Sequence, residues 1–230
     1  MARLSLVALS AALVVSSATA AAAAVLVVRS SGPSASSYPP GKALPDNHVL
    51  KLKASDTVIL LDSRGTRTLQ GPGDFSVSAD AAPSAAARTA GTSTRRVRLG
   101  AVRGTGTRSV WQADLGQSGN VCVANPADLG LWRADSSGET SVTLTEAASG
   151  KKAEVKFAAG QSIAPWPTAL PATSNTRVDV TGLGTPTTLT LKVLSPIPTG
   201  LEGMAQSLIR ADCEAQLDVL IDTFSARSAG

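Results

Sequence analysis

The residues of this chain best suited to covalent chemistry are two cysteines, Cys122 and Cys213, and a single histidine, His48. Two thiols can form a disulfide, bind a metal ion or, beside a histidine, supply a nucleophile. A metal site would need more ligands than two thiols and one imidazole, and a nucleophilic cysteine would need His48 as its partner. We therefore favour a disulfide, which would close a loop of roughly 90 residues and contribute about 4 to 5 kcal/mol in the chain-entropy model.

Other patterns associated with catalysis are weak. Ser63 and Ser109 lie outside any G-x-S-x-G setting, and Gly104-Thr105-Gly106 lacks the third glycine of a dinucleotide loop. Four carboxylates fall on the polar face of an expected C-terminal helix, where solvated acids are normal: Asp212, Glu214, Asp218 and Asp222. We predict that the chain is not an enzyme and has no catalytic residue, cofactor or metal. Carboxylates brought together from distant segments are the alternative.

A basic strip runs through the middle of the chain, with no acid between Asp80 and Asp114. Its members are Arg88, Arg95, Arg96, Arg98, Arg103 and Arg108. One interpretation is a solvated loop, and the other is a contact for an anionic surface such as lipid headgroups or an acidic partner. The formal net charge is only +4 and aromatic residues make up 3% of the chain, so we expect no nucleic-acid partner.

The N-terminus has the composition of an export signal. Arg3 precedes an uncharged run from Leu4 to Val28, and small residues follow its apolar core. We predict a signal peptide over residues 1–22, with cleavage near Ala20 to Ala22. The alternative is an uncleaved anchor, because a run of this length can span a bilayer. Both place the bulk of the chain outside the cytoplasm, and export to an oxidising compartment supports the disulfide.

The elements that must position these residues are mainly β. We expect a flexible lead-in over 23–45, a small β region over 46–78 with a hairpin at Asp62-Ser63-Arg64-Gly65, and a basic linker or loop over 79–108. A β-rich domain over 109–226 follows, in which alternating runs near 142–157 and 178–193 form hairpins. This pattern predicts antiparallel, sandwich-like β structure with a C-terminal helical element.

The helical element begins after Pro198. Thr199-Gly200-Leu201-Glu202 fits a capping box, in which the threonine hydroxyl and the glutamate carboxylate accept from free amides. Apolar residues then follow helical spacing from Leu201 to Phe224, and the stripe contains Cys213. We expect one helix broken near Asp212, or two consecutive helices, with the stripe in the core and Cys213 tied to the strand of Cys122. A partner-binding face is the alternative for the stripe.

Two parts of the sequence resemble known exported proteins. Leu50–Val58, Leu61–Leu69 and Gly71-Pro72-Gly73 resemble the opening of FecR-like periplasmic β domains. Three further segments resemble uncharacterised exported proteins of Gram-negative bacteria: Leu131-Trp132-Arg133, Trp166-Pro167 and Cys213-Glu214-Ala215-Gln216-Leu217-Asp218. The resemblance implies a β protein of the periplasm.

These observations together predict an exported, non-enzymatic periplasmic protein that binds or scaffolds a partner in the envelope. The first alternative is a membrane-anchored envelope-signalling component of FecR type. The second is a hydrolase with an unrecognised site, for which His48 would be the only imidazole base.

Overall fold

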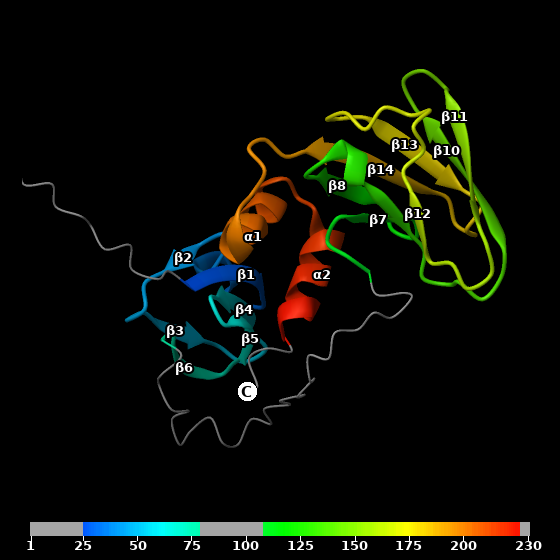
Figure 1. Ribbon diagram of the computed structural model, residues 1–230. Helices are drawn as coiled ribbons and strands as arrows, with labels where there is room; N and C mark the ends of the chain where they lie inside the picture. The colour runs from blue at the N-terminus through cyan, green and yellow to red at the C-terminus, as the bar shows by residue number, and fades with distance from the viewer. Residues whose placement is uncertain (1–24, 79–107, 226–230) are drawn as a thin grey trace, which may run out of the picture.

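The computed structural model describes residues 25–78 and 108–225 of the chain. These residues are mainly β, with two helices at the C-terminal end, so the predicted fold class is confirmed. Figure 1 shows two groups of strands, with the helices lying between them. We call residues 25–78 the N-terminal β unit and residues 108–194 the sandwich. The signal peptide at 1–22 and all of the predicted linker except Arg108 lie outside the described residues.

The N-terminal β unit contains a four-stranded sheet and a two-stranded one, and every strand pair in it is antiparallel. The larger sheet has the order β2-β1-β4-β5 and the smaller joins β3 to β6. Their bounds are β1 (Val25–Ser31), β2 (Ala43–Leu44), β3 (Val49–Leu52), β4 (Thr57–Asp62), β5 (Gly65–Gln70) and β6 (Gly73–Ser76). The predicted hairpin is confirmed: β4 pairs with β5, and Gly65 has a φ of +134°.

The first strand corrects the prediction of a flexible lead-in over 23–45. Within that range the chain forms β1, a 3-10 turn at Ala35–Ser37 and β2. Val25 and Val27 pack into the core of the unit, whereas Leu26 and Val28 face the helices. A strand buried on both faces has no polar alternation, so β1 is an unbroken apolar run in the sequence. It therefore looked like the end of the export signal.

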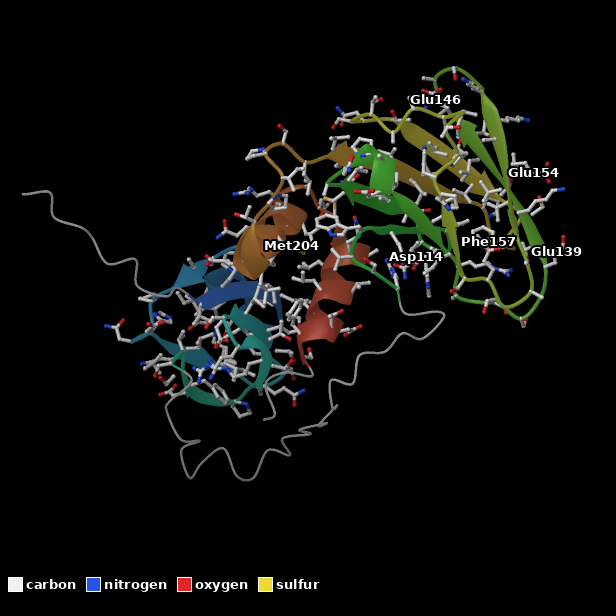
Figure 2. All side chains as sticks on the ribbon, in the orientation of Figure 1. Asp114, Glu139, Glu146, Glu154, Phe157 and Met204 are labelled. Carbon is white, nitrogen blue, oxygen red and sulfur yellow. A yellow bond between two sulfur atoms is a disulfide. The ribbon has the colours of Figure 1, made fainter. Side chains whose placement is uncertain are left out.

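The sandwich packs a five-stranded sheet, β11-β10-β13-β14-β8, with a three-stranded sheet, β12-β9-β7. The bounds are β7 (Gln112–Asp114), β8 (Gly119–Val123), β9 (Gly130–Trp132), β10 (Thr140–Glu146), β11 (Lys152–Phe157), β12 (Ile163–Pro165), β13 (Arg177–Thr181) and β14 (Thr187–Val193). Figure 2 labels Phe157, which is fully buried, and Glu154, which is exposed. This alternation along β11 is the one that the sequence predicts.

Both predicted hairpins of the sandwich are present, as β10–β11 and β13–β14. Two strand pairs depart from the antiparallel pattern, because β8 pairs parallel with β14 and β7 pairs parallel with β9. Parallel pairing of β8 and β14 joins strands that are far apart in the sequence, and no turn pattern reveals it. It also leaves β8 as an edge strand beside the helices.

The C-terminal element is two helices, α1 (Gly200–Arg210) and α2 (Glu214–Ser225), and the predicted break near Asp212 is confirmed. Asp212 has a φ of +57°, which turns the chain between them. The capping box is not formed. Gly200 has a φ of +69°, the Thr199 side chain makes no cap bond, and Glu202 accepts from Gln206 instead. The left-handed conformation of Gly200 makes the first turn irregular, and the box needs a regular one.

The helices do not belong to the sandwich alone, as a single domain over 109–226 would require. Their buried side chains form one cluster with Leu26, Val28 and Leu61 of the N-terminal β unit and with Cys122 of β8. The prediction that the apolar stripe is core is confirmed, since Ala205, Leu208, Cys213, Leu217, Leu220 and Ile221 are buried. The two helices therefore bridge the two β regions.

Candidate functional site

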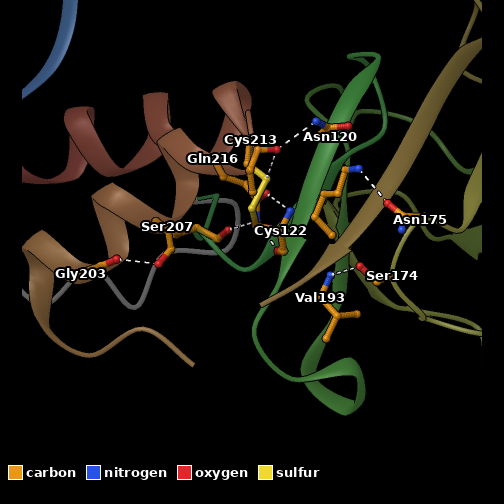
Figure 3. Close-up of a disulfide and its surroundings, with 12 residues drawn as sticks. Asn120, Cys122, Ser174, Asn175, Val193, Gly203, Ser207, Cys213 and Gln216 are labelled. Carbon is orange, nitrogen blue, oxygen red and sulfur yellow. Dashed lines mark hydrogen bonds between the residues drawn. A yellow bond between two sulfur atoms is a disulfide. The ribbon is translucent and has the colours of Figure 1, made fainter. Parts of the chain in front are cut away.

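The predicted disulfide is present and lies at the junction of the helices with the sandwich. Cys122 in β8 is bonded to Cys213 in the turn between α1 and α2, with their Cα atoms 5.9 Å apart and 91 positions apart in sequence. Both cysteines are fully buried. Figure 3 shows the bond between the edge strand and the start of α2. It links the helices covalently to the sandwich.

A glutamine reinforces the disulfide from one helical turn away. The Cys122 amide donates to Oε1 of Gln216 at 2.5 Å, and Nε2 of Gln216 donates to the Cys122 carbonyl at 2.8 Å (Figure 3). Nε2 also donates to the Val110 carbonyl at 2.6 Å. Gln216 is only 1% exposed, and its amide takes the place that a neighbouring strand would take beside β8. One side chain thus satisfies the backbone groups of Cys122 at the β8 edge of the five-stranded sheet.

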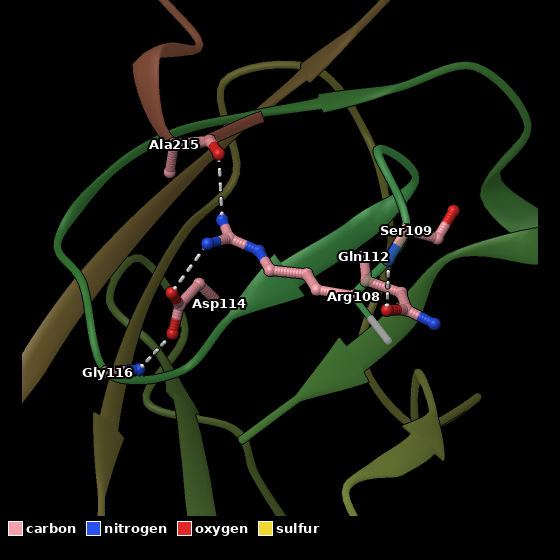
Figure 4. A network of polar contacts seen from close by, with 6 residues as sticks. All are labelled: Arg108, Ser109, Gln112, Asp114, Gly116 and Ala215. Carbon is pink, nitrogen blue, oxygen red and sulfur yellow. Dashed lines mark hydrogen bonds and ion pairs between the residues drawn. The ribbon is translucent and has the colours of Figure 1, made fainter. Parts of the chain in front are cut away.

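We call Cys122, Cys213 and Gln216 the clamp. An ion pair lies close to it (Figure 4). Arg108 contacts Oδ2 of Asp114 at 2.9 Å, and the exposed fractions of the two side chains are 14% and 5%. Arg108 also donates to the Ala215 carbonyl in α2 at 3.0 Å and lies over the Trp132 ring at 5.3 Å. The Gly116 amide donates to the other oxygen of Asp114 at 2.8 Å. A charge-assisted pair of this kind is stronger when it is partly buried and also hydrogen-bonded.

The position of Arg108 bears on the predicted anionic-surface strip. Its guanidinium is used inside the protein, between Asp114, Trp132 and the first turn of α2. The other five members of the strip, Arg88, Arg95, Arg96, Arg98 and Arg103, lie outside the described residues. Contact with an anionic surface therefore stays a prediction for those five.

The same helices are held to the N-terminal β unit on their other side. Arg29 in β1 pairs with Asp218 in α2 at 2.6 Å, and the Thr66 hydroxyl donates to the Ile221 carbonyl at 3.1 Å. The segment Cys213–Asp218 thus combines contacts with both β regions. Cys213 and Gln216 contact β8, Leu217 joins the apolar cluster, and Asp218 contacts β1.

A polar pocket of about 310 Å³ opens beside the clamp, between β7, β8 and the start of α2. Asp212, Glu214 and Asp218 contribute carboxylates to its lining, and Gln112 and Asn120 contribute amides. The side-chain amide of Asn120 donates through Nδ2 to the Ala211 carbonyl at 3.0 Å. In residues 25–78 and 108–225, no group of three or more histidine, cysteine or acidic side chains is arranged to hold a metal ion.

Two further buried polar centres organise loops away from the junction. The Asp56 carboxylate accepts from the amides of Ser34 at 2.8 Å and Lys53 at 2.5 Å. Burial raises the pKa of Asp56, but the hydrogen bonds from Ser34 and Lys53 outweigh it and hold the pKa below its ordinary value. In the sandwich, Arg133 is 2% exposed and donates to the carbonyls of Gln161, Gly138 and Ala158 and to the Thr140 hydroxyl.

The remaining candidates from the sequence take ordinary positions. His48 lies in the N-terminal β unit, edge-on to Tyr38 with ring centroids 6.2 Å apart. The Ser109 hydroxyl accepts from the Trp111 amide. Sequence reasoning missed Gln216, Asp114, Asp56 and Arg133. Only Gln216 carried a signal, because it is a polar residue one turn after Cys213 on an apolar helical stripe.

The fold is that of a β protein with two units joined through a helix pair. One disulfide links this helix pair to the sandwich. Comparisons of the chain with family models, with curated proteins and with solved structures found no match. The FecR-like resemblance of residues 50–73 therefore stays a prediction from the sequence. Within the described part of the chain, neither helix is long and apolar enough to cross a membrane.

Proposed function

We propose that the chain is an exported, non-enzymatic protein of the periplasm that binds or scaffolds a protein partner in the envelope. The observation that carries the proposal is the clamp of Cys122, Cys213 and Gln216, which fixes two β regions to one helix pair. A buried disulfide is typical of an oxidising compartment. A fixed arrangement of two surfaces is what a scaffold requires.

The chemistry of the junction supports a binding role over a catalytic one. Asp114 uses both carboxylate oxygens on Arg108 and on the Gly116 amide, and Gln216 uses its oxygen and its nitrogen on backbone groups. These side chains hold chain segments together. An acid or base would instead need a proton-accepting or proton-donating atom directed at a substrate.

Cross-linking in intact cells tests the scaffold. The tagged wild type and the variant Cys122→Ser/Cys213→Ser are cross-linked in the periplasm, purified, and their partners identified by mass spectrometry. We expect the wild type to capture a defined envelope protein and the variant to capture it at least several-fold less. A wild type that captures nothing above the level of an unrelated exported protein would contradict the proposal.

The basic strip is tested separately, with vesicles. The variant Arg95→Glu/Arg96→Glu/Arg98→Glu should lose co-sedimentation with anionic vesicles. A control with the same change of charge, Lys151→Glu/Lys152→Glu/Lys156→Glu in the β10–β11 hairpin, should keep it. Equal binding by all three proteins, or no preference for anionic over neutral vesicles, would remove the anionic-surface contact.

The position of β1 is the observation that favours the FecR-type alternative. This strand begins at Val25, within the end of the uncharged run Leu4–Val28, and lies between β2 and β4. An uncleaved anchor would therefore continue into a strand on which the helices pack. N-terminal sequencing of the exported protein separates the two functions. A terminus between Ala20 and Val25 supports the released scaffold, whereas a retained Met1 supports the anchored component.

A further inference from the structure

The α1–α2 pair contacts the two β regions through different kinds of interaction. Towards the N-terminal β unit the contact is mainly apolar, with Leu26, Val28 and Leu61 in one buried cluster with Leu217 and other helix side chains. The Arg29–Asp218 ion pair and the hydrogen bond from Thr66 to Ile221 add to it. The fully buried member that the sandwich contributes to this cluster is Cys122 itself, while Val110 and Leu194 are only partly buried. The hydrophobic effect therefore holds the helices mainly on the N-terminal side.

Towards the sandwich the helices are held by the disulfide and by a few hydrogen bonds. These run from Gln216 to Cys122 and Val110, from Asn120 to Ala211 and from Arg108 to Ala215. Gln216 lies one turn after Cys213, so the position of its amide beside Cys122 follows from the position of the two sulfurs. Each hydrogen bond contributes little net free energy, since water can replace it. The disulfide is the strongest element on this side.

We propose that the Cys122–Cys213 disulfide is a redox latch on the geometry between the two β regions. When the cysteines are oxidised, the helices and the sandwich form one rigid body. When a dithiol reduces the bond, the sandwich is released from the helices, which stay packed on the N-terminal β unit. Contacts of this limited, polar kind between two folded regions allow relative motion by default.

The exchange reaction has a defined order of steps. A thiolate of the dithiol attacks Sγ of Cys213, the bond between the two sulfurs breaks, and Cys122 leaves as a thiolate. The second thiol of the dithiol then displaces Cys213, so the reductant ends as a disulfide. Its two electrons and two protons end on Cys122 and Cys213 as thiols. Both sulfurs are buried in the folded protein, so the attack follows a local opening of the chain. Cys213 is the sulfur reached first, because it lies in a turn between exposed Asp212 and Glu214, whereas Cys122 lies inside β8.

Hydrogen exchange read by mass spectrometry tests the latch on the full exported chain. The oxidised protein is compared with the same protein reduced by dithiothreitol in native buffer and with Cys122→Ser/Cys213→Ser. We expect peptides covering Gln112–Asp114 and Gly119–Val123 to exchange at least about tenfold faster after reduction. Peptides covering Val25–Ser31 and Leu217–Ile221 should keep their protection. Gln206→Ala, which removes an exposed contact of α1, is the control that should match the oxidised wild type.

Three results would overturn the latch. Equal loss of protection in α2, β1 and β8 would show that the helices depend on the sandwich for their packing. Unchanged exchange in β8 after complete reduction would show that the disulfide does not set this contact. Resistance of the folded protein to reduction would show that a dithiol cannot open it. The reduced wild type keeps the test decisive if the double variant does not fold.

Discussion

The N-terminal β unit and the sandwich are both sheets, but they bury their strands differently. In β1 the residues Val25 to Val28 are all buried, because one face meets the core of the unit and the other meets the helices. In β10 of the sandwich, Val142 and Leu144 are buried between the more exposed Ser141 and Thr143. The N-terminal β unit therefore needs the helices to cover its sheet, whereas the sandwich closes its own core.

This difference explains why the junction has two kinds of contact. A sheet whose outer face is apolar keeps the helices by burial of side chains such as Leu26 and Leu220. A sandwich with a wet outer face has no such surface to offer, so the contact is made at its edge strand β8 by a disulfide and a side-chain amide.

Loss of the disulfide should have the largest effect on stability. Cys122→Ser/Cys213→Ser opens a loop spanning 91 positions, and we expect the free energy of unfolding to fall by about 4 to 5 kcal/mol. Urea denaturation of the variant and of the oxidised wild type measures it. Chemically reduced wild type should match the variant. A loss below about 1 kcal/mol would contradict a clamp role for the disulfide.

Truncation of one buried leucine in each region should lower the free energy of unfolding by a similar amount. The two variants should differ in which other elements they loosen. Leu26→Ala and Leu144→Ala both empty fully buried positions, and each should cost about 2 to 5 kcal/mol. Leu26→Ala should also speed hydrogen exchange in α2, since Leu26 shares the cluster with Leu217 and Leu220. Leu144→Ala should leave α2 unchanged. If both variants loosened α2 equally, the assignment of the helices to the N-terminal unit would be wrong.

Removal of the Gln216 amide should have a moderate effect. Gln216→Ala leaves the Cys122 amide and the carbonyls of Cys122 and Val110 without this partner, at a cost of about 2 to 3 kcal/mol. Thermal unfolding in the oxidised state measures the change. Gln206→Ala, at a half-buried position of α1 whose side chain donates to exposed Glu202, should stay within about 0.5 kcal/mol of the wild type. Equal effects of the two variants would mean that the clamp contributes nothing beyond the disulfide.

The smallest effect should be confined to acid pH. Hydrogen bonds from Ser34 and Lys53 hold the pKa of Asp56 below its ordinary value of 3.8 despite its burial. A carboxylate with a lowered folded pKa stabilises the fold above its unfolded pKa, and this contribution disappears as the pH falls through the folded pKa. Asp56→Asn should therefore flatten the pH dependence of stability below about pH 4.

Asp135 provides the comparison within the sandwich. Its pKa is also lowered, chiefly by the hydrogen bonds from the Ser137 hydroxyl and amide, but Asp135 is exposed. Asp135→Asn should change the acid limb less than Asp56→Asn does, because solvent screens exposed charges. Denaturation series from pH 2 to 7 measure both variants. A larger change for Asp135→Asn would contradict the structural role given to Asp56.

Much of the sandwich could be predicted because its signals are local. Gly150 marks a tight turn of the sandwich, as Gly65 does in the N-terminal β unit, and the alternation of Val142 and Val155 with polar neighbours shows which face is buried. The disulfide could be predicted because the chain has two cysteines, which can pair with each other. These inferences need no knowledge of which distant segments meet.

The rest depends on contacts between distant segments. Val25–Val28 forms a strand that is buried on both faces only because helices about 180 residues later in the chain cover it. The pairing of β8 with β14 depends on the overall topology. The pairing of Arg108 with Asp114 could not be inferred, because the sequence shows Arg108 as one more member of a basic strip. Gln216 is the one case where a polar residue on an apolar stripe gave a readable hint.

The edge strand β8 of the sandwich is linked covalently to the turn between α1 and α2. Tryptic mapping of the purified protein without reduction, after alkylation under denaturing conditions, tests this link. We expect peptides 109–133 and 211–227 to be recovered as one linked species with no alkylated cysteine. Recovery of the two peptides separately, each with an alkylated cysteine, would contradict it.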